Sequence, residues 1–244
     1  MNILIVRTAS RGANMNAVSY NWQEVGLARA LRRAGHLCDI VFYGGNQESV
    51  VEIPVDDISN SMPIKLRYLR GVSLYDSGLF FGLSEIARRY DIVQVAEYDQ
   101  PESWFLAGKF PDKVVVYHGP YYSEFNKRYN LKCKAADVAF LRRYKRNGTP
   151  FITKSRSAKS FLMDKGLENV TALGVGLDPK QLETSCSFEG DQIGRELNSL
   201  HDGGYVNLLY VGKIEPRRNP YLLLDVIEKL SLIHISEPTR HAQI

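Results

Sequence analysis

The sequence predicts an α/β protein built around a doubly wound, mostly parallel sheet. Short apolar runs such as ILIV (3–6) and VVVY (114–117) alternate along the chain with stretches in which apolar residues recur every three or four positions. The first pattern is typical of a strand buried on both faces, and the second is typical of an amphipathic helix. Strands separated by helices favour parallel pairing through right-handed crossovers. We therefore expect a Rossmann-like domain over residues 1–183.

The elements of this domain follow in a regular order. After the strand at 3–6, a helix is expected over 21–34, because Val25, Ala28 and Leu31 share one face and Gly35 can end it. Further strands are expected over 38–44, 91–98, 113–119, 150–155 and 169–176. Further helices are expected over 82–90, 101–110, 126–146 and 157–166.

The rest of the chain divides into three parts. Residues 184–204 are polar and lack a period, which predicts a linker, with a short helix as an open alternative. A strand-like run and a helix that reaches Lys229 make 205–229 the start of a second α/β domain, most of which we expect to be missing. The string LSLIHISEPTR (230–240) resembles the translation of a sequencing-library adapter, so we expect 230–244 to be an artefact, a genuine tail being the alternative.

Composition limits the class of protein. Of the 244 residues, 44% are hydrophobic and 24% are charged, with a net charge of +4, which excludes a disordered, collagenous or fibrous chain. Cys38, Cys133 and Cys186 have no C-x-x-C spacing, so we expect neither a disulfide framework nor a zinc site. The first residues lack the pattern of a signal peptide, and no apolar run is long enough to cross a bilayer. We expect a cytoplasmic protein that is at most peripheral to a membrane.

The clearest motif is YVGKIEPRRNP (210–220). Gly212 and Lys213 follow a strand-like run, Arg218 lies in the next turn, and Asn219 with Pro220 can begin a helix. Fixed cations beside a helix N-terminus favour a diphosphate, because side-chain charge and helix dipole both attract an anion there. A solvated charged turn is the alternative. No G-x-G-x-x-G or Walker motif occurs, so a dehydrogenase or a P-loop enzyme is not expected.

These residues resemble family 4 of the glycosyltransferases, which have the GT-B fold of two Rossmann-like domains facing each other across a cleft. The family's second domain commonly opens with G-R-L-x-x-x-K-N, and Lys213 and Arg218 match its two cations with the basic types interchanged. The segments VGLARALRRAGHLCDIVFY, VQVAEYD, VVVYHGPYY, TKSRSAKSFL and GVGLDPKQL resemble parts of the family's first domain.

The resemblance implies roles for residues at the strand ends. His118 is implied to position the transferred sugar, without acting as a nucleophile; a histidine packed in a loop is the alternative. The donor's diphosphate is implied to contact Gly212, Lys213, Arg218 and Asn219, so that His118, Lys213 and Arg218 would act in catalysis. The acceptor side of the cleft is implied to include Arg7, Asn16, Tyr20, Glu97, Gly119, Lys154 and Ser155.

A basic helix follows the histidine. Between 127 and 146 it carries eight basic residues against one acid, with apolar residues such as Leu131 and Val138 on another face. Such a helix can lie on an anionic membrane surface, while a solvated face is the alternative. Nucleic acid is not expected as a partner, because no recognised binding module accompanies the charge. The basic residues are Lys127, Arg128, Lys132, Lys134, Arg142, Arg143, Lys145 and Arg146.

The resemblance implies transfer of a sugar from a nucleotide-diphosphate sugar to a glycan or lipid-linked acceptor, in the synthesis of a bacterial surface polysaccharide. The reaction would retain anomeric configuration and need no metal or other cofactor, with electrostatic stabilisation of the leaving group as the main catalytic effect. The family's E-x7-E motif does not occur after Tyr205, so we expect the chain alone to be inactive. The alternatives are a non-catalytic acceptor- or membrane-binding module and another GT-B enzyme, such as a nucleotide-sugar epimerase.

Overall fold

The structure is a computed structural model of the chain. It describes residues 1–10, 23–55, 62–122, 127–176, 178, 192–203, 210, 214 and 219–236. The chain forms two compact units, Met1–Cys186 and Ser187–Ile244, and each is treated by itself below.

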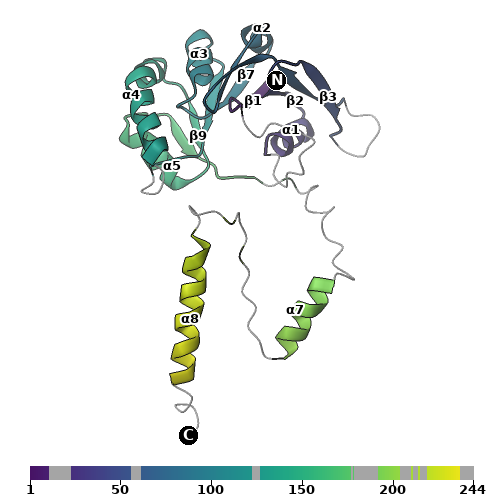
Figure 1. The fold of residues 1–244 in the computed structure, drawn as a ribbon. Coiled ribbons are helices and arrows are strands. Elements are labelled where there is room, and N and C mark those ends of the chain that lie inside the picture. Colours follow the sequence, from purple (N-terminus) through teal and green to yellow (C-terminus); the bar gives the residue numbers. More distant parts are fainter. Residues whose placement is uncertain are drawn as a thin grey trace. The chain divides into compact units, whose positions relative to one another are not determined.

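An eight-stranded sheet lies at the centre of the first unit (Figure 1). Its order is β10-β9-β8-β7-β1-β2-β4-β3, and every neighbouring pair is parallel except β3 with β4 at the edge. The predicted doubly wound parallel sheet is therefore confirmed. The strands are β1 (Asn2–Val6), β2 (Leu37–Tyr43), β3 (Ser49–Ile53), β4 (Ile64–Leu69), β7 (Ile92–Ala96), β8 (Val114–His118), β9 (Phe151–Thr153) and β10 (Val170–Ala172).

The winding of the sheet reverses direction beside β1. The chain runs from β1 outward to β2 and β4, then returns to the other side of β1 with β7 and continues outward to β8, β9 and β10. Open α/β sheets bind ligands beyond the carboxyl ends of the strands at such a reversal. The residues that follow β1, β7 and β8 are therefore the first place to look for a site.

Two apolar clusters hold the helices against the sheet. Leu4 and Val6 of β1 face a cluster that includes residues of four helices, while Ile3 and Ile5 face α1. Because β1 alternates between two buried faces, its sequence is a continuous apolar run. The helices are α1 (Gln23–Arg33) on one face, and α2 (Leu83–Ala87), α3 (Pro101–Lys109), α4 (Lys127–Asn147) and α5 (Arg156–Asp164) on the other.

Local signals in the sequence explain where these helices begin and end. Gly35 has a φ of 82° just after α1, a conformation that glycine adopts without steric cost. Pro101 begins α3, and the Oγ of Ser155 caps α5 by accepting a hydrogen bond of 3.1 Å from the N–H of Ala158. Each predicted helix of this unit is present, although α2 is shorter than expected.

The region between residues 45 and 81 differs from the prediction, which placed no strand there. It contains β3 and β4 of the main sheet and a separate hairpin of β5 (Gly71–Leu74) and β6 (Ser77–Phe80). Most of β3 is exposed, and only alternate positions of β4 are fully buried. These strands thus lack the continuous apolar run that identifies a central strand from sequence.

In the second unit, the described residues form two helices. Helix α7 (Gln192–Asp202) lies in the segment predicted to be a linker, so the short helix left open there is present. Helix α8 (Pro220–Ser236) begins at the predicted residue but continues past Lys229, where we expected it to end. The predicted strand over 206–213 lies largely outside the described residues. Among the described helices, none combines the length and the hydropathy that crossing a bilayer requires.

Candidate functional site

Three side chains from adjacent strand ends meet at the carboxyl edge of the sheet. Glu97 follows β7, His118 ends β8 and Lys154 follows β9. The Oε2 atom of Glu97 lies 2.6 Å from the Nδ1 atom of His118, and its Oε1 atom lies 3.5 Å from the Nζ atom of Lys154. Oε2 also accepts a hydrogen bond of 3.1 Å from the N–H of Gly119. The structure thus brings four of the predicted site residues together around one carboxylate.

The backbone at Glu97 is held in an unusual conformation. Its φ of 59° lies in the left-handed region, which costs a residue other than glycine on the order of 1–3 kcal/mol. The preceding carbonyl of Ala96 accepts hydrogen bonds from the hydroxyls of Thr8, at 2.8 Å, and Ser103, at 2.7 Å. The N–H of Glu97 donates to the carbonyl of Tyr117 at 3.0 Å. These contacts fix the strand end, and the sequence analysis did not identify Thr8 or Ser103.

The surroundings of Glu97 favour its ionised form. Burial by itself raises the pKa of this carboxyl, but the contacts with His118, Lys154 and the N–H of Gly119 outweigh burial and hold the pKa below its ordinary value. The side chain of Glu97 remains 18% exposed. Glu97 is therefore a carboxylate that remains partly accessible.

His118, by contrast, is completely buried. Its ring stacks on Phe161 at 5.7 Å between centroids and meets the edge of Tyr98 at 5.2 Å. Neither ring nitrogen makes a hydrogen bond of normal geometry in the part of the chain that the structure describes, and Nδ1 makes only the ion-pair contact with Glu97 Oε2. His118 ends β8, where the sequence places it, and its side chain faces Glu97 and the aromatic core.

Lys154 depends on the glycine beside it. Its Nζ atom lies 4.9 Å above the ring of Tyr117, and the side chain is 30% exposed. A Cβ atom placed on Gly119 would lie 2.5 Å from the Cδ atom of Lys154, so a larger residue would displace the lysine. Gly119 was implied to lie on the acceptor side of the cleft, and in the structure its missing side chain makes room for Lys154.

The remaining predicted site residues divide into two groups. Arg7 pairs with Glu24 of α1, at 3.8 Å, and lies over the ring of Phe42, while Ser155 caps α5. Asn219 is exposed just before α8, with a φ of 42°. Outside the described residues lie Asn16, Tyr20, Gly212, Lys213 and Arg218.

The electrostatics of the cluster favour a neutral ligand. Glu97, Asp99 and His118 each offer one metal-ligating atom, and these atoms lie within 4.8 Å of one another. However, the Nζ atom of Lys132 lies 2.6 Å from the Oδ2 atom of Asp99, and Lys154 neighbours Glu97, so each carboxylate already has a cation. A divalent cation would have to displace or tolerate both lysines. The arrangement therefore suits hydrogen bonding better than metal ligation.

The basic helix α4 uses its cations in two ways. Lys132 pairs with Asp99, and the guanidinium of Arg143 stacks 3.4 Å from the ring centroid of Trp104. The six other basic residues are exposed: Lys127, Arg128, Lys134, Arg142, Lys145 and Arg146. Leu131 and Val138 are 70% and 88% exposed and therefore share the solvent-facing side with the cations. Packing against the core comes instead from residues such as Cys133, Ala136 and Tyr144.

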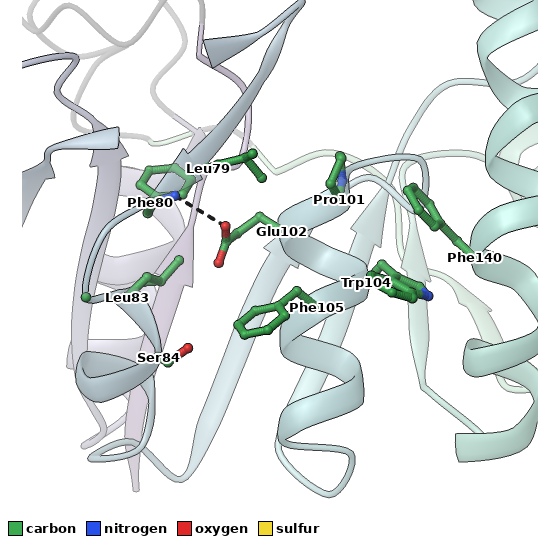
Figure 2. Close-up of a pocket in the computed structure, with 10 residues that line it drawn as sticks. Leu79, Phe80, Leu83, Ser84, Pro101, Glu102, Trp104, Phe105 and Phe140 are labelled. Atoms are coloured by element: carbon green, nitrogen blue, oxygen red, sulfur yellow. Dashed lines mark hydrogen bonds between the residues drawn. The ribbon is translucent and has the colours of Figure 1, made fainter. Parts of the chain in front are cut away.

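A pocket of about 390 Å³ lies between β6, α2, α3 and Phe140 of α4, away from the cluster of Glu97, His118 and Lys154 (Figure 2). Figure 2 shows the carboxyl group of Glu102 between Phe80, Leu83 and Phe105, and its Oε2 atom accepts the N–H of Phe80 at 3.3 Å. Burial raises the pKa of Glu102, and the Phe80 N–H offsets only part of this effect. None of the predicted site residues lines this pocket.

Comparison with known proteins identifies the family. Residues 25–181 match glycosyltransferase family 4, and because this match covers more than half of the chain, the protein belongs to that family. Together with the doubly wound sheet, membership confirms the predicted GT-B fold class.

One similar solved structure is described as trehalose-6-phosphate from E. coli bound with UDP-2-fluoro glucose. The sequence identity is 12% and the TM-score is 0.43. The alignment covers 81% of this chain and 54% of that one, so the chain spans about half the length of that relative. A search of curated proteins found no match.

Proposed function

We propose that this chain supplies the acceptor side of a glycosyltransferase that transfers a sugar from a nucleotide-diphosphate sugar to a glycan or lipid-linked acceptor. The observation that carries the proposal is the cluster of Glu97, His118 and Lys154 beyond the carboxyl ends of β7, β8 and β9. It lies next to the reversal of the sheet, where this class of fold binds ligands. Family membership supports the same reaction class.

The donor's diphosphate would bind to the second unit, through Gly212, Lys213, Arg218 and Asn219. Lys213 and Arg218 would neutralise the charge that develops on the leaving diphosphate, which is an electrostatic form of catalysis that needs no metal. We propose that the reaction retains anomeric configuration and serves surface polysaccharide synthesis in a bacterium. His118 is proposed to position the reacting groups at the centre.

The exposed side of α4 supports a membrane-bound acceptor. The six exposed cations of α4 share its solvent-facing side with Leu131 and Val138. These two apolar side chains are 70% and 88% exposed. Each cation near an anionic leaflet contributes about 1 kcal/mol of attraction, and exposed apolar residues can enter the headgroup region. We propose that α4 rests on the cytoplasmic face of the membrane and brings the cluster to a lipid-linked acceptor.

The test begins with the source DNA. Sequencing across the codon for Lys229 decides whether the frame continues and encodes two glutamates in the E-x7-E spacing. If it does, the longer protein is purified and incubated with UDP-, GDP- and ADP-sugars and a membrane extract as the source of acceptor. We expect release of the nucleoside diphosphate together with a glycosylated product. Free epimerised donor in place of a transfer product would identify the alternative enzyme class.

Two variants connect the activity to the cluster. Glu97→Gln in the longer protein should lower transfer on the order of a hundredfold, a loss typical of one preorganised polar group. Glu85→Gln is the matched control, because Glu85 is 62% exposed on α2 and pairs only with Arg88 in the structure described. Equal activity of the two variants would reject the cluster as the site. Sugar transfer by residues 1–244 alone would refute the expectation that this chain is inactive.

A further inference from the structure

We infer that the carboxylate of Glu97 and the ammonium of Lys154 together bind a single hydroxyl group of the acceptor. His118 is a positioning residue for Glu97. This inference rests on the proposed function and assigns the roles within its site. Its first basis is accessibility, because the side chain of His118 is 0% exposed whereas those of Glu97 and Lys154 are 18% and 30% exposed.

The second basis is the number of hydrogen bonds that Glu97 can accept. A carboxylate offers about four lone-pair positions, two on each oxygen. The Oε2 atom is already occupied, because it lies 2.6 Å from His118 Nδ1 in an ion-pair contact and accepts the N–H of Gly119 at 3.1 Å. The Oε1 atom receives only Lys154, at 3.5 Å, from the described residues. Among the described residues, one position on Oε1 is therefore left without a donor, on the side of the carboxylate that neighbours Lys154.

The third basis is the chemistry that fits this position. A hydroxyl group can donate its proton to Glu97 Oε1 and accept a hydrogen bond from Lys154 Nζ at the same time. A phosphate or carboxylate attracted by Lys154 would be opposed by Glu97 at the same position, and an ammonium group attracted by Glu97 would be opposed by Lys154. The pair thus selects a neutral alcohol, the group that a sugar or another polyol presents.

Glu97 orients this hydroxyl and does not remove its proton. A general base is most effective when its pKa lies near the working pH. The contacts of Glu97 with His118, Lys154 and Gly119 lower the pKa of its carboxyl, which makes the carboxylate a weak base. Its effect is expected mainly in the binding of the acceptor.

The experiment uses the 244-residue chain and needs no sugar transfer. The backbone amide of Gly119 donates to Glu97, so its NMR signal reports on that carboxylate. The signal is followed during titration with myo-inositol, inorganic phosphate and methylammonium. We expect myo-inositol to shift it and the two ions to leave it unchanged. Glu97→Gln should weaken binding of myo-inositol about tenfold or more, the effect of losing a hydrogen bond to a charged group.

Substitutions of His118 separate positioning from direct contact. The side-chain amide of His118→Asn reaches the place of Nδ1 and can still donate to Glu97, whereas His118→Gln imitates Nε2 and His118→Phe donates nothing. We expect His118→Asn to keep the myo-inositol shift and both other variants to lose it. The opposite ranking of Asn and Gln, a shift caused by either ion, or no shift with myo-inositol would overturn the inference. Because the readout is binding, a failure here is distinguishable from a failure of sugar transfer.

Discussion

Replacing Lys132 by methionine should destabilise the first unit, although Lys132 belongs to a run of basic residues that look interchangeable in the sequence. Its partner Asp99 has a side chain that is 2% exposed, and the Oδ1 atom of Asp99 has no partner among the described residues. Removing one member of a buried ion pair costs roughly 3–5 kcal/mol, but Lys132 is itself 37% exposed, so partial hydration lowers our expectation to about 2–3 kcal/mol. Methionine keeps most of the lysine's apolar stem, so the loss reports on charge.

The assay is urea unfolding followed by the circular dichroism of the sheet and helices. Lys134→Met is the matched control, since Lys134 lies on the same helix and is exposed; surface substitutions usually change stability by less than about 0.5 kcal/mol. In a thermal scan the Lys132 variant should melt roughly 5–10 °C below the control. Equal stability of the two variants would refute the reasoning, because it would mean that Asp99 does not need its cation.

Four further predictions concern other charged groups of the first unit. Glu102→Gln should stabilise the protein at neutral pH but not at acid pH. The pKa of Glu102 is raised in the folded state, so the contribution of this carboxyl to the free energy of unfolding is complete below its unfolded pKa and is lost as the pH rises through its folded pKa. Glu97→Gln should show the opposite pH dependence in urea unfolding. The pKa of Glu97 is lowered in the folded state, so its carboxylate stabilises the protein above the unfolded pKa, and this stability is lost as the pH falls through the folded pKa. Parallel pH profiles of the two variants would contradict the directions given for both pKa values. Exchanging exposed Lys134 and Arg142 for glutamate should weaken binding to phosphatidylglycerol vesicles in a sedimentation assay by at least tenfold, with no such loss on phosphatidylcholine vesicles; equal loss on both would argue against an electrostatic contact. Calorimetric titration with Mn²⁺ should give the same result for the unchanged protein and for Glu97→Gln, because lysines already neighbour the carboxylates of Glu97 and Asp99. A binding signal that disappears in Glu97→Gln would identify a metal site.

The sequence was most informative for elements whose burial or capping leaves a local pattern of residues. Strand β1 is buried on both faces and reads as an uninterrupted apolar run, and α5 carries its own capping serine. The hairpin of β5 and β6 and the edge strand β3 were missed because none of them has the apolar run or the regular alternation that marks a strand. Strands β3 and β5 are mostly exposed, and β6 is mostly buried but only 4 residues long. Their strand structure depends on pairing, of β3 with β4 and of β5 with β6, and on the surrounding tertiary structure.

Helix α4 shows the same division at the level of single residues. The sequence identified the helix and its excess of positive charge, and the structure confirmed its position at Lys127–Asn147. Which cations face solvent could not be predicted, because Lys132 pairs with Asp99 in the loop after β7 and Arg143 stacks on Trp104 of α3, both far away in the sequence. Apolar residues were misread as well: Leu131 and Val138 face solvent.

The sequence by itself determined that Glu97, His118 and Lys154 each follow an apolar strand, and therefore that each lies at the carboxyl edge of a parallel sheet. Only the tertiary structure decided that they meet. Ala96 pairs with Tyr117 and His118 pairs with Thr153, so the residues that follow in each strand are brought side by side. A shift of one residue in this register would turn each side chain to the other face of the sheet. Register arises from the packing of the whole sheet, and for that reason the burial of His118 and the exposure of Glu97 could not be read from the chain.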